Sequence, residues 1–176
     1  MTFAPNSAKA SFAPMVDARS RVLVLGSLPG EMSLARGQYY ANPQNQFWRL
    51  IGAVIGADLT ALEYEARLQR LRAAGVGLWD VIATAERRGS LDGAIRAHRP
   101  NALADLAASL PALRAIGFNG GKALAIGRKA LGEGPSPALI ALPSSSPAFT
   151  RPFDEKLRDW LQLRAFLDGG GDQARP

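Results

Sequence analysis

The chain contains no cysteine and only one histidine among its 176 residues. Without cysteine it can form no disulfide, carry no thiolate nucleophile and offer no cysteine-based zinc or iron–sulfur site. The single histidine leaves little for metal chemistry either, and we expect no cofactor. No apolar run approaches the roughly 20 residues that a membrane-spanning helix needs, and residues 1–20 lack the apolar core of a secretory signal. We therefore expect a cytoplasmic protein that enters no membrane.

Acidic residues are also scarce, with 15 of them against 21 Lys and Arg, of which 17 are Arg. The formal net charge of +6 and the pI near 10.3 favour a polyanionic partner such as nucleic acid. The alternative is that the positive charge serves solubility alone. Residues 1–88 carry 10 basic and 7 acidic residues, and residues 89–176 carry 11 and 8. Because the excess is equal in both halves, any basic face must be assembled by folding.

The chain is predicted to form one domain over residues 1–176, with 47% hydrophobic residues to build a core. Residues 1–15 are expected to form an irregular arm, and the glycine-rich residues 168–176 a mobile tail. Between them, short apolar runs alternate with helical patterns, which is typical of a parallel sheet with crossover helices. Strands are expected over residues 21–26, 76–82, 113–118 and 138–142. Helices are expected over residues 45–56, 61–74, 102–110, 122–131 and 154–167.

Unusual sequence follows each expected strand. These segments are Gly26-Ser-Leu-Pro-Gly30, Asp80, Asn119-Gly-Gly-Lys122 and Pro143-Ser-Ser-Ser-Pro147. Because ligands of open α/β sheets bind at the carboxyl ends of the strands, we expect the four segments to converge on one cleft. The first segment fixes a tight turn whose backbone can approach a ligand, although a plain turn would also explain it. It is neither a P-loop nor a Gly-x-Gly-x-x-Gly motif.

Residues 39–48 combine four aromatic residues and two asparagines directly ahead of an amphipathic helix. Asn45 stands at or near the start of that helix, where its side chain can also serve as a cap. Trp48 is expected in the core. Phe47 is expected beside the cleft, where an aromatic ring can stack on an unpaired base for roughly 1–3 kcal/mol, with a core position as the alternative.

Residues 26–30, 39–48 and 142–148 resemble the motifs of the uracil-DNA glycosylase superfamily. Residues 77–80, 88–92 and 118–122 look like the hypoxanthine-DNA (deoxyinosine) glycosylase branch, so the resemblance extends from residue 12 to about residue 167. It implies a three-layer α/β sandwich with a central four-stranded parallel sheet, no metal, and hydrolysis of the N-glycosidic bond of a damaged base flipped out of DNA.

The resemblance also implies a catalytic residue. In the mismatch-specific and thymine/uracil branches a catalytic Asn or Asp stands at the position of Leu28, whose side chain cannot hold a water. In the hypoxanthine branch, the asparagine that matches Asn45 is implicated instead. A carboxamide suits this chemistry because its oxygen can orient a water and its NH₂ group can donate to the base. The chain departs from the branch at Asn42, where histidine is usual.

Further residues are expected around the flipped nucleotide. The base-binding candidates are Phe47, Gly26, Ser27, Asp80 and Asn119. The DNA-binding candidates are Pro143, Ser144, Ser145, Ser146, Pro147, Lys122, Arg87 and Arg88. Capping roles remain the alternative for Asp80 and Asn119, an ordinary turn for the serine loop, and solvated surface positions for the two arginines. His98 is expected at the surface.

The function expected is that of a monomeric, monofunctional DNA glycosylase, bound to the nucleoid, that excises hypoxanthine from deoxyinosine in double-stranded DNA. One alternative is a uracil or mismatched-thymine glycosylase, which Leu28 disfavours. Another is a non-catalytic DNA-binding module that retains the fold without turnover. A hydrolase of free nucleosides is disfavoured because a neutral nucleoside offers no reason for the positive charge.

Overall fold

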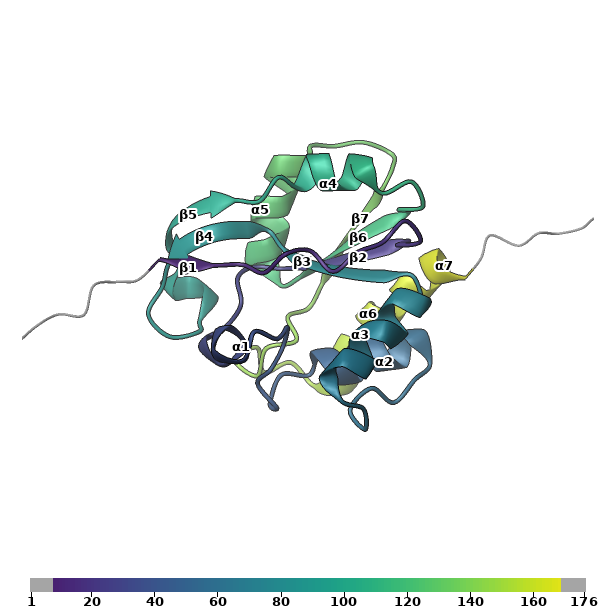
Figure 1. The fold of residues 1–176 in the computed structure, drawn as a ribbon, viewed down its shortest axis with the longest axis horizontal. Coiled ribbons are helices and arrows are strands. Elements are labelled where there is room, and N and C mark those ends of the chain that lie inside the picture. The colour runs from purple at the N-terminus through teal and green to yellow at the C-terminus, as the bar shows by residue number, and fades with distance from the viewer. Residues whose placement is uncertain (1–7, 169–176) are drawn as a thin grey trace, which may run out of the picture.

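A four-stranded parallel sheet forms the centre of the computed structural model, which describes residues 8–168 (Figure 1). Its strand order is β3-β2-β6-β7. The strands are β2 (Val22–Gly26), β3 (Val76–Asp80), β6 (Ala115–Asn119) and β7 (Ala138–Leu142). The register pairs Gly26 with Asp80 and Asn119 with Leu142, so the carboxyl ends of all four strands meet at one edge. The predicted sheet is confirmed.

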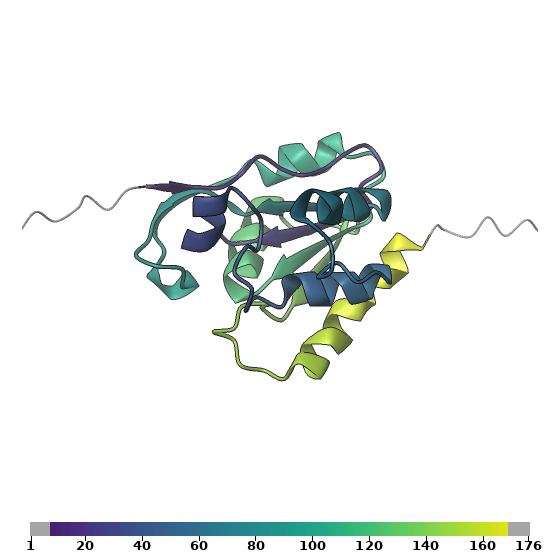
Figure 2. The ribbon, with the colours of Figure 1, turned by 60° about the horizontal axis from the view of Figure 1, so that its bottom comes forward.

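Helices cover both faces of this sheet, as Figures 1 and 2 show. One face carries α2 (Phe47–Ile55), α3 (Tyr64–Ala73) and α6 (Phe153–Trp160), and the other carries α4 (Leu103–Ser109) and α5 (Gly121–Leu131). Alternate side chains of a strand point to opposite faces. Accordingly Val22 and Val24 belong to the first core, whereas Leu23 and Leu25 belong to the second. The predicted three-layer sandwich is confirmed.

A second, antiparallel sheet of three strands lies beside the first, and the sequence did not predict it. Its order is β1-β4-β5, formed by β1 (Lys9–Ala10), β4 (Ile82–Glu86) and β5 (Arg96–Pro100). The expected strand over 76–82 therefore ends early, because the chain enters β4 after Val81. All five residues of β5 are exposed, so this strand has no alternation of apolar and polar residues that would reveal it.

The irregular arm expected over residues 1–15 has two regular contacts within its described part, and residues 11–14 carry no secondary structure. β1 pairs with β4, and Met15 forms a bridge with Leu78 and is buried. A strand of two residues carries too little pattern to be recognised, and its pairing partner was itself unpredicted. Residues 1–7 lie outside the described residues, as does the expected tail beyond Asp168.

The remaining differences concern short elements. The six-residue α1 (Glu31–Arg36) and the 3₁₀ turn η1 (Asp92–Ala94) were not predicted. The expected helix over 154–167 is three consecutive elements, α6, η2 (Leu161–Leu163) and α7 (Arg164–Leu167). The amphipathic helix α2 ends at Gly56, as predicted, because this glycine adopts a left-handed φ of 72°. Within residues 8–168, no helix is both long and apolar enough to cross a membrane.

Candidate active site

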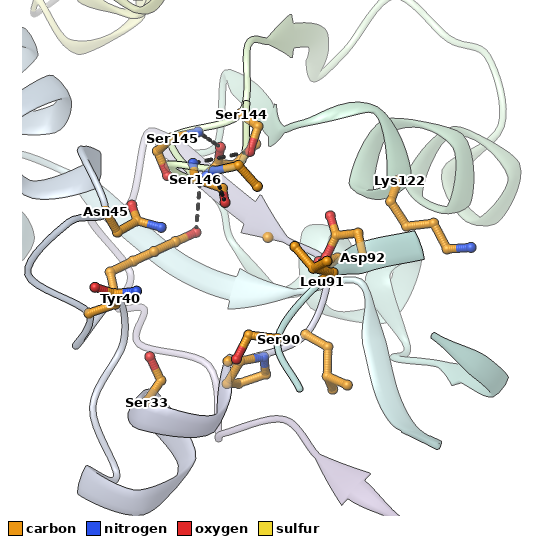
Figure 3. A pocket seen from close by; sticks show the side chains of 18 of the residues that line it. Ser33, Tyr40, Asn45, Ser90, Leu91, Asp92, Lys122, Ser144, Ser145 and Ser146 are labelled. Atoms are coloured by element: carbon orange, nitrogen blue, oxygen red, sulfur yellow. Dashed lines mark hydrogen bonds between the residues drawn. The ribbon is translucent and has the colours of Figure 1, made fainter. Parts of the chain in front are cut away.

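A cavity of about 1040 Å³ opens at the carboxyl edge of the parallel sheet (Figure 3). All four segments that were expected to converge contribute to its lining: residues 26–30, Asp80, the start of α5, and the serine loop, residues 143–147. Tyr39, Tyr40, Asn42, Asn45 and residues 90–94 add to the wall. The volume slightly exceeds the roughly 300–1000 Å³ that small-molecule sites occupy, so a flipped nucleotide would fit.

Asn45 lies in this wall, two residues ahead of α2. Its Oδ1 accepts a hydrogen bond of 2.9 Å from the backbone N–H of Phe47. This bond satisfies an N–H group at the helix start and fixes the side chain, leaving the amide NH₂ group as a donor. In Figure 3 Asn45 lies beside Tyr40 and across the cavity from Leu91 and Asp92. Capping and a position in the cavity wall therefore coexist in one residue.

Phe47 does not reach the cavity, so the expected stacking of its ring on a base is wrong. The side chain is fully buried. Its ring centroid lies 3.8 Å from that of Tyr40, on which it stacks, and 5.9 Å from that of Trp160. The helix places Phe47 on the same apolar face as Leu50 and the rest of the core stripe, which packs against the sheet. Trp48 is buried in the core, as expected.

Tyr40 takes the place in the wall that was expected for Phe47. Asn119 donates through Nδ2 to the Tyr40 hydroxyl (3.2 Å) and to Oγ of Ser145 (2.9 Å), and its Oδ1 accepts the Ser145 N–H (2.9 Å). This network joins the ends of β6 and β7 to the segment before α2. Because both N–H bonds of the Asn119 amide are used inside the protein, only a lone pair of Oδ1 remains for the expected contact with DNA.

The serine loop is held from two sides. Gln46 donates its backbone N–H to the Ser145 carbonyl (3.0 Å), and the buried Lys156 donates through Nζ to the Ser146 carbonyl (3.3 Å). Ser145 is buried, whereas Ser144 and Ser146 are half-buried and line the cavity. Their hydroxyl groups accept local backbone N–H groups and keep a proton to donate. Pro143 is half-buried and does not line the cavity, and Pro147 lines it.

Asp80 ends β3 and lines the cavity although only 4% of its surface is exposed. Within the part of the chain that the structure describes, its Oδ2 atom has no hydrogen-bond partner. Burial raises the pKa of this carboxyl to about 7, and the negative charge of Asp92 adds to the rise, whereas Arg87 opposes it. Asp92 itself accepts a 2.5 Å hydrogen bond from the Ser27 hydroxyl.

Arg87 is buried, so its expected role as a clamp on the DNA backbone is wrong. Its guanidinium donates to the carbonyls of Gly89 (2.9 Å), Leu28 (3.4 Å) and Pro29. It therefore ties the turn after β2 to the end of β4.

The neighbouring Arg88 is exposed, does not line the cavity and stays a candidate for DNA contact. Lys122 lies at the rim, with its side chain directed away from the centre (Figure 3). His98 is exposed, as expected.

The structure adds apolar residues at the mouth that sequence reasoning missed. Met32, Leu91 and Phe149 are the exposed large apolar side chains of the described chain, 40%, 61% and 44% exposed, and all three line the cavity. Exposure could not be inferred from the sequence. For Leu91 a signal existed, because residues 88–92 belong to a segment that resembles a known motif.

A parallel sheet with a nucleotide-sized cavity at its carboxyl edge, lined by apolar side chains and a few polar groups, places the chain in the class of α/β proteins that bind nucleotides or their bases. A family model then gives the particular family. The model described as "Uracil DNA glycosylase superfamily" matches residues 13–168. The chain belongs to the uracil DNA glycosylase superfamily, as its motifs predicted.

Two curated relatives and a solved structure are similar over most of the chain. A protein named hypoxanthine DNA glycosylase from Methanosarcina acetivorans is 39% identical over 152 residues, which are 86% of this chain and 95% of the relative. Its namesake from Methanosarcina barkeri is 41% identical over 114 residues, 65% of this chain and 72% of the relative. The solution NMR structure of a proposed uracil DNA glycosylase from M. acetivorans superposes with a TM-score of 0.81 at 37% identity, covering 93% of this chain and 100% of the other.

Proposed function

We propose that this protein is a DNA glycosylase that hydrolyses the N-glycosidic bond of deoxyinosine and releases hypoxanthine. The observation that carries the proposal is the geometry of Asn45, whose amide is fixed by a bond to the α2 backbone within the cavity wall. Leu28, which is buried in the same wall, cannot position a water. Both curated relatives are named for hypoxanthine, which supports the same substrate.

Asn45 serves both halves of this reaction. Breaking the bond between deoxyribose and base builds positive charge on the sugar and negative charge on the departing purine. The Asn45 NH₂ group donates to the purine, and the second lone pair of Oδ1 orients the attacking water. The positive end of the α2 dipole lies at the same place. These groups stabilise the separating charges without changing their own protonation.

The rim of the cavity makes the DNA contacts in this proposal. Ser144 and Ser146 donate their hydroxyl protons to phosphates beside the flipped nucleotide, and Lys122 and Arg88 add positive charge. The exposed apolar side chains at the mouth face the duplex, where they fill space that the flipped base leaves. The protein acts as a monomer on double-stranded DNA in the cytoplasm, at the nucleoid, and residues 1–176 work as one glycosylase domain.

The test is base release from duplex oligonucleotides that contain one deoxyinosine, one deoxyuridine or one G·T mismatch, followed by alkaline cleavage of the abasic product. Parent protein is compared with Asn45→Ala, Asn45→Ser and Leu28→Asn. Serine retains an oxygen that caps α2 but lacks the amide, so it separates capping from catalysis. We expect strong deoxyinosine cleavage by the parent and a loss of about 100-fold or more in both Asn45 variants, with Asn45→Ser as stable as the parent.

Two outcomes contradict the proposal. Release of uracil in preference to hypoxanthine would assign the chain to the competing substrate class, for which Leu28→Asn is expected to raise activity. Binding of deoxyinosine DNA without cleavage would instead indicate the non-catalytic DNA-binding module.

A further inference from the structure

One buried carboxyl in the cavity, that of Asp80, has no role in the mechanism given so far. Its backbone position is fixed, because Asn101 donates through Nδ2 to the Asp80 carbonyl (2.8 Å) and Val81 donates its N–H to the Gly26 carbonyl (2.8 Å). The side chain nevertheless leaves Oδ2 without a hydrogen bond from any described residue. A buried polar atom of this kind costs stability unless something else satisfies it.

Gly26 determines where this carboxyl can lie. A Cβ atom at residue 26 would be 2.6 Å from Oδ1 of Asp80 and 3.0 Å from the hydroxyl oxygen of Tyr40. Because glycine carries no Cβ, the carboxyl and the tyrosine hydroxyl occupy that space beside the cavity. Oδ2 is enclosed by the protein, but Asp80 and Tyr40 both line the cavity and 4% of the Asp80 surface remains exposed. An occupant of the cavity can therefore touch the edge of this carboxyl.

The charges around Asp80 leave it without a counter-ion. Arg87, the cation whose charge acts on this carboxyl, directs its guanidinium to three backbone carbonyls. Asp92, on η1, adds negative charge and is held in place by Ser27. Tyr39 and Tyr40, on the segment before α2, are neutral at pH 7, and burial raises the pKa of both hydroxyls further above their ordinary value of 10. These surroundings favour the uncharged form of the carboxyl.

We propose that Asp80 acts as an uncharged carboxylic acid that donates its proton to a ring nitrogen of the flipped purine, which makes it a second catalytic residue beside Asn45. This inference rests on the proposed function. As the bond between C1′ and N9 breaks, its electron pair moves onto the purine and the Asp80 proton forms a new N–H bond there. Water adds to C1′ and releases a proton, which restores the Asp80 carboxyl. The products are neutral hypoxanthine and an abasic site.

The acceptor pattern of hypoxanthine fits this donor. Its N3, N7 and O6 atoms are all acceptors, and the negative charge of the departing base spreads over them. Uracil offers no unprotonated ring nitrogen, because its N3 carries a proton and its N1 carries the sugar. Asp80 is therefore expected to favour a purine base, and the pKa of about 7 keeps much of the acid protonated at neutral pH.

The experiment is single-turnover release of hypoxanthine between pH 5 and pH 9 by the parent, Asp80→Asn, Asp80→Leu, Asp92→Asn and Asp154→Asn. The parent rate is expected to fall as pH rises through about 7. Asp80→Leu, which has no donor, should lose about 100-fold or more at pH 6. Asp80→Asn keeps a donor but no transferable proton, so its slower rate should not change with pH.

Asp92→Asn removes a negative charge near the Asp80 carboxyl and should move the midpoint of the pH–rate profile to lower pH. Asp154, exposed on α6, is the matched control, and Asp154→Asn should behave as the parent.

The outcomes separate this inference from the proposed function. A parent rate that rises with pH would make Asp80 a base that activates water, and a flat profile or a fully active Asp80→Leu would remove it from the chemistry. Each of these overturns the inference while deoxyinosine glycosylase activity stands. If the parent releases no hypoxanthine at any pH, both proposals fail together.

Discussion

At the residue scale, the cavity contains polar side chains with two opposite hydrogen-bonding states. Asn119 has both N–H bonds of its amide paired inside the protein, and Ser145 accepts one of them and donates its backbone N–H in return. Arg87, behind the lining, donates to three backbone carbonyls. These groups hold the walls in position. Asp80 has an unpaired oxygen although it is almost fully buried. Groups whose pKa is shifted in this way gather at functional sites, which supports a catalytic role for Asp80.

The first prediction at this scale concerns stability and pH. In the unfolded chain the Asp80 carboxyl has its ordinary pKa of 3.8, whereas in the folded protein the pKa is about 7. Between these values the folded state binds more protons, so stability falls as pH rises from about 4 to about 7 and then levels off. Asp80→Asn removes this loss. The difference in free energy of unfolding between Asp80→Asn and the parent should therefore grow in favour of the variant by on the order of 2–3 kcal/mol from pH 5 to pH 8.

Urea unfolding followed by circular dichroism at pH 5, 6, 7 and 8 measures this difference. Asp154→Asn on the exposed side of α6 is the control, and its difference from the parent should stay constant with pH. A constant difference for Asp80→Asn as well would show that the carboxyl ionises as readily in the folded protein as in the unfolded chain.

Single residues also show where sequence reasoning stops. Asn45 could be located because it stands directly ahead of an amphipathic helix at the strand edge. Phe47 was assigned to the wrong side although its helical spacing to Leu50 and Ile51 places it on the apolar stripe of α2, which packs against the sheet. Tyr40 adopts a left-handed φ of 52°, an unusual conformation for a residue with a side chain. Its direction into the cavity was therefore not predictable.

At the element scale, the loop of the β4–β5 hairpin forms one wall of the cavity at the carboxyl edge of the parallel sheet. The four parallel strands were predictable because each is a short apolar run followed by a turn. The hairpin was not, since β5 is fully exposed and its pairing with β4 contains register shifts. Its loop, residues 90–94, nevertheless lines the cavity opposite Asn45 (Figure 3). Part of the wall, residues 90–94 and Arg96, thus belongs to a hairpin without a periodic signal.

Arg87 and Arg88 give a prediction about how this hairpin is attached. Arg87→Ala removes the donor for the carbonyls of Leu28, Pro29 and Gly89 and leaves a buried void. We expect it to lower the free energy of unfolding by about 2–3 kcal/mol. Arg88→Ala at the exposed neighbour should stay within about 0.5 kcal/mol of the parent and should weaken DNA binding instead.

Chemical denaturation and fluorescence anisotropy on a labelled duplex measure the two effects separately. The pair of variants is matched in residue type and differs by one position in the chain. Equal loss of stability in both would mean that the burial of Arg87 contributes nothing, and unchanged DNA affinity in Arg88→Ala would remove Arg88 from the interface.

At the scale of the whole molecule, exposed apolar side chains at the mouth of the cavity occur together with an excess of positive charge over the chain. Large apolar side chains are exposed there, and the chain that carries them has a net charge of +6. A duplex with a flipped nucleotide offers partners for both, since phosphates attract the positive charge and the opened base stack accepts apolar groups. A free nucleoside would use neither feature, which favours DNA as the substrate.

Salt dependence tests that argument. If about four phosphates are neutralised on binding, log K should fall against log salt with a slope of about −3.6, or roughly 100-fold in affinity between 50 and 200 mM salt. The measurement is anisotropy of a deoxyinosine duplex with Asn45→Ala, which binds without turnover, and of an undamaged duplex with the parent. Both should show similar slopes, because phosphates are shared by the two duplexes, whereas the deoxyinosine duplex should bind more tightly at every salt concentration. A slope near zero for both would show that the positive charge does not contact the DNA backbone, and the cavity would then serve a neutral ligand.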